Sequence, residues 1–318
     1  ALEIAAAGGH NIAFFGPPGS GKSMLAKAFP SILPAMSFDE ILEVSRIYSI
    51  AGQINHAEST LVTERPFRSP HHSASIAGIV GGGNPPKPGE ITLAHKGVLF
   101  LDEFTEFNRA VLEVLRQPLE DRVVTVSRAQ QAFTFPAQFI FLVAMNPCPC
   151  GFLGDSDKQC LCSPNLIQRY LGKLSGPLMD RIDMEIEVPR LPEGDLIQKN
   201  KSTSGESSAL IRDRVERARL IQKTRFENAG LSILLNSEMQ GEAMRKFCEL
   251  DAESEVLMAQ AVRRYQLSGR AFDRMLKLAR TIADLENCDA IQVAHLAEAL
   301  QYRCYEKLMQ TGAIGARV

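Results

Sequence analysis

Residues 16–23 read GPPGSGKS and fill the pattern G-x-x-x-x-G-K-[ST] of a phosphate-binding loop. An apolar run at residues 12–15 precedes the loop, and a helix-compatible stretch at residues 24–28 follows it. In this context glycines let backbone N–H groups turn toward a triphosphate, and the helix N-terminus adds partial positive charge. Lys22 is expected to reach the β- and γ-phosphates, and Ser23 to take one Mg²⁺ position. The sequence therefore predicts binding of a nucleoside triphosphate with Mg²⁺.

Two acids supply a second part of this chemistry. Residues 98–101 form an apolar run that ends in Asp102 and Glu103. At the carboxyl end of a parallel strand, Asp102 is placed to hold Mg²⁺, directly or through water, and Glu103 to orient and deprotonate the attacking water. The expected nucleotide contacts are Gly16, Pro17, Pro18, Gly19, Ser20, Gly21, Lys22, Ser23, Met24 and Asp102.

Asn146 follows another apolar run, at residues 139–145. A polar side chain at the tip of such a strand can bridge the γ-phosphate and the attacking water. An Asn that merely opens a proline turn has the same local pattern, so the residue alone leaves both interpretations open.

Four cysteines stand close together after Asn146, with the spacing C-x-C-x₉-C-x-C. They can complete a tetrahedral Zn²⁺ site, which would be structural because four thiolates leave no open coordination position. The usual ribbon spacing is C-x-x-C, so the match is imperfect, and four unliganded thiols are the alternative. The proposed ligands are Cys148, Cys150, Cys160 and Cys162. The remaining cysteines, interpreted as small core side chains, are Cys248, Cys288 and Cys304.

Composition limits the remaining possibilities. The chain has 318 residues, of which 45% are hydrophobic, and this length favours two domains over one. A net charge of −2 means that any contact with nucleic acid must be local. No apolar run approaches the ~18 residues of a membrane span and no signal-peptide pattern opens the chain, so the seven cysteines indicate a reducing, cytoplasmic setting. Because the first residue is Ala rather than Met, we expect a fragment of a longer protein.

The pattern of elements changes near residue 190. Residues 1–190 alternate helices with continuous apolar strand candidates at residues 12–15, 97–101, 139–145 and 184–188, which predicts an α/β nucleotide-binding domain with a parallel sheet. A capping box at Ser37 and Glu40 opens one helix. Residues 205–318 show helical periodicity without strand signals, which predicts a helical lid. Its expected helix starts are capping boxes at residues 237–240 and 289–292, and a long amphipathic helix covers residues 268–285.

Two segments of the first domain are interpreted as inserts. Residues 121–136 hold two β-prone runs, which predict a hairpin with Arg128 near its tip, placed to contact a phosphate backbone. An ordinary surface hairpin has the same pattern. Residues 66–89 are irregular and form a second candidate insert, with a third irregular segment in the Cys-rich loop at 147–163. The basic and imidazole side chains of the second insert are Arg65, Arg68, His71, His72 and Lys87.

Longer strings carry a family resemblance: GPPGSGKS (16–23), FRSPHHSAS (67–75), GGGNPPKPGEITLAHKGVLFLDE (81–103), NPCPCG (146–151), LSGPLMDRID (174–183) and SGRAFDRMLKLARTIADL (268–285). Through them the whole chain resembles the AAA+ ATPases, and within these the magnesium-chelatase-like branch that includes the ComM (YifB) family. The resemblance implies a three-layer α/β/α P-loop NTPase domain with a C-terminal helical lid. It also implies ATP hydrolysis in hexameric rings.

The same resemblance implies roles for three residues. Asn146 matches the sensor-1 position, and Arg181 matches the arginine finger offered to the ATP of a neighbouring subunit. Arg270 matches sensor 2 of the lid, with Arg274 one turn further along as an alternative. In related ring ATPases the hairpin before sensor 1 projects into the central pore and grips the polymer.

Two functions are compatible with these features. The favoured one is a DNA-remodelling motor, a helicase or branch-migration ATPase, as in ComM-like proteins, in which a Lon-protease-like domain precedes this module. The alternative is a chelatase- or chaperone-type subunit whose ring acts on a partner protein without touching DNA. The ComM-like strings and the cysteine cluster favour the first, and the near-neutral charge keeps the second in play.

Overall fold

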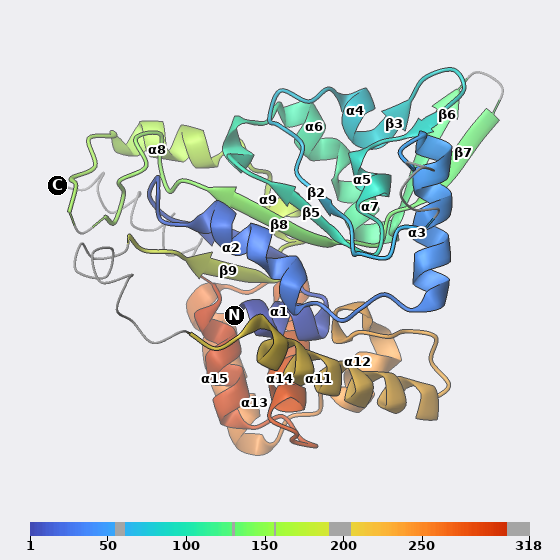
Figure 1. The fold of residues 1–318 in the computed structure, drawn as a ribbon. Helices are drawn as coiled ribbons and strands as arrows, with labels where there is room; N and C mark the ends of the chain where they lie inside the picture. The colour runs from blue at the N-terminus through green and yellow to red at the C-terminus, as the bar shows by residue number, and fades with distance from the viewer. Residues whose placement is uncertain (55–60, 129–130, 156, 191–204, 304–318) are drawn as a thin grey trace. The chain divides into compact units, whose positions relative to one another are not determined.

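A five-stranded parallel sheet forms the centre of the α/β part (Figure 1). The computed structural model describes residues 1–54, 61–128, 131–155, 157–190 and 205–303. The sheet has the order β2-β5-β8-β1-β9, so the first strand lies between the last two of the chain. Ligands bind open α/β sheets where the strand order reverses in this way, at the carboxyl ends of the strands. The strands are β1 (Ile12–Phe15), β2 (Phe67–Arg68), β5 (Val98–Leu101), β8 (Ile140–Met145) and β9 (Met184–Glu187).

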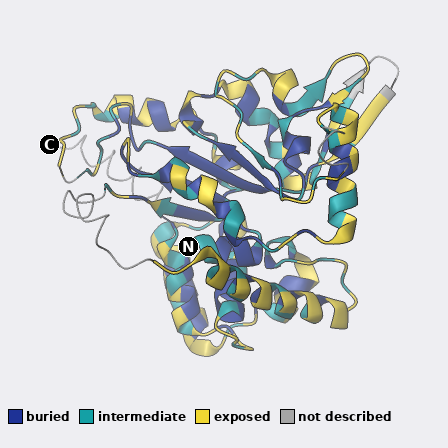
Figure 2. Ribbon diagram, viewed as in Figure 1, coloured by how far each residue is buried: buried dark blue, intermediate teal, exposed yellow. Residues whose placement is uncertain are grey.

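Apolar strands explain why this sheet lies inside the protein. Every residue of β1, β5 and β8 is buried, as the dark blue strands in Figure 2 show. β5 pairs with β8 in parallel, Val98 opposite Ile140, and β2 pairs with β5, Phe67 opposite Val98. Helices flank the sheet, as continuous apolar strands require. The four strands predicted from apolar runs are confirmed, and the short β2 was not predicted.

Short helices and two hairpins make up the rest of the α/β part. Ser37 caps α3 with the predicted capping box to Glu40. The predicted hairpin of residues 121–136 is confirmed as β6 (Val123–Arg128) and β7 (Gln131–Pro136), and the second insert contains β3 (Gly81–Gly82) and β4 (Lys87–Pro88). The helices are α2 (Lys22–Ala28), α3 (Phe38–Ala51), α4 (Ile76–Val80), α5 (Glu90–Leu93), α6 (Arg109–Val114), α7 (Arg116–Asp121), α8 (Pro164–Leu171) and α9 (Gly176–Met179), with 3₁₀ turns η1 (Phe29–Ile32) and η2 (Phe104–Glu106).

The C-terminal part is helical over its described residues 205–303. Its elements are α11 (Ser208–Asn228), η4 (Asn236–Glu238), α12 (Gly241–Phe247), α13 (Ala252–Tyr265), α14 (Gly269–Leu285) and α15 (Val293–Gln301). The predicted helix at residues 268–285 is confirmed, with Ser268 as its N-cap.

Both predicted capping boxes of this part were wrong by three residues. Gln240, expected at the third helical position, is itself the N-cap of α12, because residues 236–238 form a 3₁₀ turn first. Gln292 is likewise the N-cap of α15, and its backbone N–H donates to Nδ1 of His295. The helices exist where expected, but each begins later than the polar pattern indicates.

The chain divides into two compact units. The α/β unit contains residues 13–30 and 35–181. The second unit, called the helical unit here, contains residues 1–12, 31–34 and 182 onward, so it includes strand β9 of the sheet as well as the C-terminal helices. Helix α1 (Leu2–Gly8) packs on α11 and α14, which explains why the start of the chain groups with its C-terminal helices rather than with residues 13–181. The proposed division into residues 1–190 and 205–318 did not contain this feature. No helix in the described part of the chain is long and apolar enough to cross a membrane.

Candidate nucleotide-binding site

The phosphate-binding loop joins β1 to α2 at the carboxyl end of its strand. Its backbone N–H at Gly16 donates to the carbonyl of Met145, 3.4 Å away, which ties the loop to the end of β8. Gly19 and Gly21 have φ values of 78° and 93°, a region that side chains other than Gly rarely adopt. Gly21 is the N-cap of α2, and Lys22 is the first helical residue. The loop therefore has the backbone shape that the sequence motif requires.

Lys22 is a buried cation whose contacts are all uncharged. Its Nζ donates to the carbonyls of Gly16 (2.7 Å) and Pro17 (2.8 Å) and to Oδ1 of Asn146 (3.4 Å). Burial lowers the pKa of Lys22, and the negative charge of Asp102 only partly opposes this. The hydroxyl of Ser20 is also buried, with no hydrogen-bond partner among the described residues. An anion in the loop would satisfy both groups, which is the fit expected for phosphate.

Ser23 and Asp102 lie together, as the Mg²⁺ prediction requires. The Ser23 hydroxyl donates to Oδ2 of Asp102 at 2.6 Å, and the backbone N–H of Glu103 donates to Oδ1 of the same carboxylate at 2.9 Å. A hydroxyl beside a carboxylate is the protein ligand pair that Mg²⁺–nucleotide sites use. Glu103 itself is exposed and has a φ of 50° at the turn that leaves β5.

His72 reaches the candidate base, a contact that sequence reasoning missed. Its Nδ1 lies 3.1 Å from Oε2 of Glu103, and its ring packs edge-on against Phe107. The ring of His71 lies against that of His72, with centroids 4.0 Å apart and the planes tilted by 35°, and its Nδ1 bonds to the hydroxyl of Ser73 at 2.8 Å. The string FRSPHHSAS pointed to this segment, but nothing in its local pattern names Glu103 as a partner.

The two predicted arginines have different surroundings. Arg181 follows α9 and pairs with the carboxylate of Glu120 in α7 and the carbonyl of Pro177. Arg270 is exposed in the first turn of α14 and belongs to the helical unit. Within the α/β unit, the structure thus brings Lys22 and Asn146 into contact, and likewise Ser23 and Asp102. Arg181 is held by other partners.

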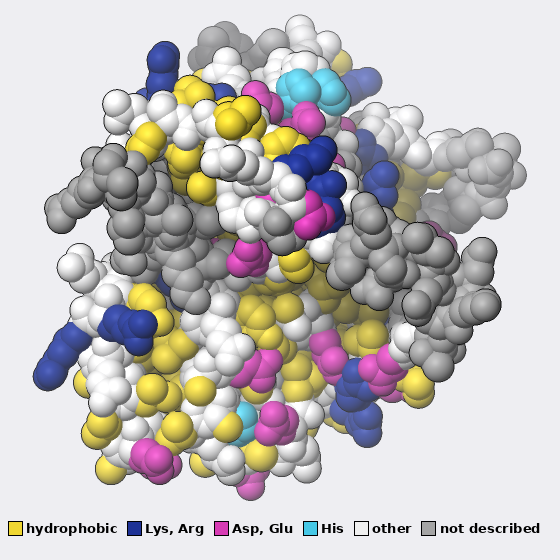
Figure 3. Space-filling model, turned by 90° about the vertical axis from the view of Figure 1, so that its left-hand side faces the viewer, with side chains coloured by type: hydrophobic (Ala, Val, Ile, Leu, Met, Phe, Trp, Pro, Cys, Tyr) yellow, Lys and Arg dark blue, Asp and Glu magenta, His cyan; other side chains and the backbone are white. Residues whose placement is uncertain are grey.

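The basic residues proposed to contact a polymer differ in whether they already form ion pairs. The side chain of Arg128 and residues 129–130 lie outside the described residues. Arg68 makes a two-point ion pair with Glu90, both contacts at 2.7 Å, and Arg65 donates to Glu40 at 3.0 Å, whereas Lys87 is exposed. On the face drawn in Figure 3, Lys and Arg side chains form separate groups with Asp and Glu among them.

The four predicted zinc ligands converge. Their sulfur atoms all lie within 4.8 Å of one another, and all four cysteines are free thiols. Burial, and next a hydrogen bond to Cys150, raise the pKa of Cys148 to about 12. Burial opposes ionisation of Cys150, yet bonds from the backbone N–H groups of Phe152 and Leu161 lower its pKa to about 6. The cluster can hold a metal ion.

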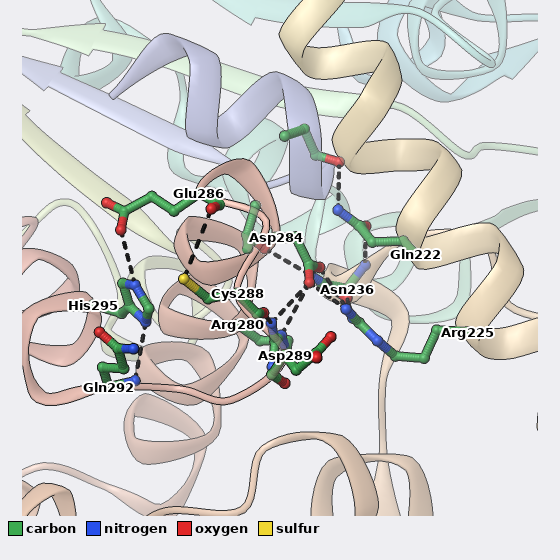
Figure 4. Close-up of polar contacts among 12 residues, drawn as sticks. Gln222, Arg225, Asn236, Arg280, Asp284, Glu286, Cys288, Asp289, Gln292 and His295 are labelled. Atoms are coloured by element: carbon green, nitrogen blue, oxygen red, sulfur yellow. Dashed lines mark hydrogen bonds and ion pairs between the residues drawn. The ribbon is translucent and has the colours of Figure 1, made fainter.

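A buried ionic network lies in the helical unit (Figure 4). The side chain of Asp284 is fully buried in α14, and it accepts from both terminal nitrogens of Arg225, from Nε of Arg280 at 3.1 Å and from Nδ2 of Asn236 at 2.8 Å. Arg280 also donates to the carbonyl of Asp289 at 2.7 Å. A carboxylate with this many donors is fully compensated, so the network serves packing rather than a ligand.

A smaller group next to this network contains potential metal ligands: Glu286, Cys288 and His295. His295 is buried, its Nε2 lies 3.1 Å from Oε2 of Glu286, and its Nδ1 accepts the N–H of Gln292 (Figure 4). Both ring nitrogens therefore already have a protein partner, and the helix cap explains the arrangement.

Comparison with known proteins identifies the family. Residues 1–196 match the family model described as magnesium chelatase, subunit ChlI, and residues 205–303 match that of its C-terminal region. The chain is 46% identical to the competence protein ComM of Haemophilus influenzae over 98% of its own length, and 44% identical to the uncharacterized protein YifB of Escherichia coli over 97%. It spans 58% of the length of each. The chain belongs to the magnesium-chelatase-like family of AAA+ proteins, together with ComM and YifB.

Proposed function

We propose that this chain is the ATP-hydrolysing module of a ring motor that remodels DNA. The observation that carries the ATPase part is the pairing of Lys22 with Asn146 and of Ser23 with Asp102, at the ends of β1, β5 and β8. Lys22 and Ser23 begin α2, Asp102 follows β5 and Asn146 follows β8, so three separate segments bring these groups together. A shared phosphate ligand explains their proximity better than packing does. The family gives ATP and Mg²⁺ as the expected cofactors.

Each residue then has a defined task. Lys22 donates to the β- and γ-phosphates in place of its present loop carbonyls, and Ser20 and the N–H groups of the loop bind the remaining oxygens. Ser23 and Asp102 would hold Mg²⁺, which would supply positive charge against the phosphates. Glu103 takes the proton of the attacking water, and Asn146 orients that water and the γ-phosphate.

A neighbouring subunit completes the site in this proposal. Arg181 is held by Glu120 rather than by the phosphate loop of its own chain, which suits a finger offered in trans. A finger of this kind is worth on the order of 10³–10⁵ in rate in other nucleotidases. Arg270 acts as sensor 2, on the resemblance of residues 268–285. The ring is a hexamer, it works in the cytoplasm, and its cofactors are ATP, Mg²⁺ and a structural Zn²⁺ at the cysteine cluster.

DNA is the proposed substrate because the β6–β7 hairpin comes just before the strand that ends at Asn146, as the polymer-gripping hairpin does in related motors, and because the chain is 46% identical to a competence protein. The chain spans 58% of that relative, so the whole protein's activity belongs to the proposal. The alternative, a chelatase- or chaperone-type subunit, is favoured by one observation. Arg65 and Arg68 already pair with acids, which leaves fewer cations for phosphates than the sequence indicated.

ATP hydrolysis with and without single-stranded and branched DNA tests the proposal. We expect hydrolysis that Glu103→Gln lowers by roughly 10²–10⁴-fold and that both DNA substrates stimulate. Arg128→Ala should flatten the salt dependence of DNA binding by about one charge. Mixing Arg181→Ala with Glu103→Gln chains should restore part of the activity, because some interfaces then contain both intact groups. Hydrolysis that no DNA stimulates, in a chain that binds no DNA, would refute the DNA role and favour the alternative.

A further inference from the structure

The cysteine cluster has the dimensions of an occupied metal site. Zn–S bonds of ~2.3 Å in a tetrahedron place neighbouring sulfurs about 3.8 Å apart, whereas a disulfide requires ~2.05 Å. The Sγ atoms of Cys148 and Cys150 lie 3.4 Å apart, those of Cys148 and Cys160 3.7 Å, and those of Cys150 and Cys160 3.6 Å. Cys162 completes the set within 4.8 Å.

Backbone N–H groups of the loop lie against two of the sulfur atoms. N–H groups of Phe152 and Leu161 hydrogen-bond to Cys150, and the N–H of Leu153 bonds to Cys148. Bonds of this kind orient the ligands of structural metal sites and stabilise their charge. Four sulfur ligands select a soft divalent ion, Zn²⁺ before all, and they leave no position for a substrate.

The cluster also touches the phosphate-binding loop, within the α/β unit. Gly151 follows the second cysteine, with its N–H bonded to the carbonyl of Cys148 at 2.9 Å and a φ of 83°. A Cβ built on Gly151 would lie 2.5 Å from Cδ of Pro18 and 3.7 Å from Cγ of Asn146. The backbone of the cysteine loop therefore packs directly on Pro18, with no room for a side chain.

We infer that Cys148, Cys150, Cys160 and Cys162 bind one structural Zn²⁺, and that this ion holds Gly151 against Pro18 and so keeps the phosphate-binding loop in its binding shape. The inference rests on the nucleotide site proposed above. It goes beyond that proposal because nucleotide affinity would then depend on Zn²⁺, although the ion does not contact the nucleotide. Loss of Zn²⁺ releases the turn at Gly151, and the loop then has to be ordered by the nucleotide itself.

Zinc content and nucleotide affinity are measured separately. Protein purified without added metal should contain about one Zn²⁺ per chain, and Cys160→Ser with Cys162→Ser should remove it. The Kd of a fluorescent ATP analogue should then rise about tenfold, a common size for coupling between two sites. A zinc-selective chelator with Mg²⁺ in excess should raise the Kd of the unaltered chain equally, and added Zn²⁺ should reverse it.

Two further variants distinguish zinc binding from its effect on nucleotide affinity. Gly151→Ala should keep the zinc but weaken the nucleotide, because the new methyl group meets Pro18. Cys288→Ser, outside the cluster, should change neither quantity. Absence of zinc from the unaltered chain would overturn the metal site. Zinc that is bound and removable without any change in Kd would overturn the coupling and leave the metal site standing. A chain that holds zinc but binds no nucleotide would overturn the coupling together with the proposed ATPase.

Discussion

Lys22 and Asp284 are both buried charges, 8% and 2% exposed, and the protein treats them in opposite ways. Asp284 receives two guanidinium groups and an amide, so its charge is cancelled by side chains of its own unit. Among the described residues, Lys22 donates only to two carbonyls and one amide oxygen, and burial lowers its pKa more than the charge of Asp102 raises it. The charge of Asp284 is balanced by side chains of its own unit, whereas that of Lys22 is balanced only in part.

The difference teaches where a ligand belongs. Removing a charge from water costs several kcal/mol, so a protein that leaves such a charge uncancelled needs a partner from outside. In the helical unit, the buried charge of Asp284 is cancelled by Arg225 and Arg280 of the same unit. The α/β unit keeps Lys22, together with the unpartnered hydroxyl of Ser20, for a phosphate.

The largest expected effects concern Lys22, which is proposed to bind the phosphates, and Glu103, which is proposed to activate water. Lys22→Ala should abolish ATP binding, whereas Glu103→Gln should keep binding and lower turnover by roughly 10²–10⁴-fold, because only water activation is lost. A thermal-shift titration distinguishes them. Ligand at ~100 times Kd should add about 2.7 kcal/mol to the Glu103 variant and nothing to the Lys22 variant.

Lys27→Ala is the matched control, since Lys27 is an exposed lysine of the same helix α2. It should change neither binding nor turnover. If Lys22→Ala bound ATP as tightly as the unaltered chain, the comparison between the two buried charges would fail, because Lys22 would then need no anion.

The next largest effect is expected at Asp284, whose charge is cancelled within its own unit. Asp284→Asn leaves Arg225 and Arg280 facing each other without their carboxylate, which should destabilise the helical unit by about 3–5 kcal/mol. Circular dichroism during urea unfolding measures this. Asp273→Asn, an exposed acid of the same helix, should stay within about 0.5 kcal/mol. Unchanged stability of the Asp284 variant would show that the network does not hold the unit.

Local patterns made much of this architecture predictable. The loop at residues 16–23, the acids after β5 and the strands themselves are each encoded in a few consecutive residues, because apolar runs and Gly-rich turns act locally. The four cysteines were also found in this way, since their short spacing forces proximity.

Contacts between distant segments were not predictable. Arg225 and Asp284 each look like ordinary helix-surface charges in the sequence, and only packing of α11 on α14 brings them together. The same holds for α1, whose apolar residues give no sign that they pack on C-terminal helices. The misplaced helix starts at Gln240 and Gln292 have a related cause, because several polar residues in a row offer alternative caps.

The smallest expected effect concerns His72, which contacts the proposed base Glu103. His72 holds the exposed carboxylate with Nδ1 at 3.1 Å and is itself fixed against Phe107, so we expect it to position the base. His72→Phe, which keeps an aromatic ring but removes both ring nitrogens, should lower kcat on the order of 10-fold with little change in KM for ATP, because misaligned bases lose rate rather than binding. His72→Gln, which keeps a polar group, should recover part of the loss.

His71→Phe is the control for this prediction. His71 lies against the same ring but bonds to Ser73, so its loss should leave kcat within about twofold of the unaltered chain. A rise in KM equal to the fall in kcat/KM would place His72 in substrate binding instead. Equal kcat for His72→Phe and the unaltered chain would mean that Glu103 holds its working position without help. In that case the exposed base, unlike the buried Lys22, would depend on no neighbour for its function.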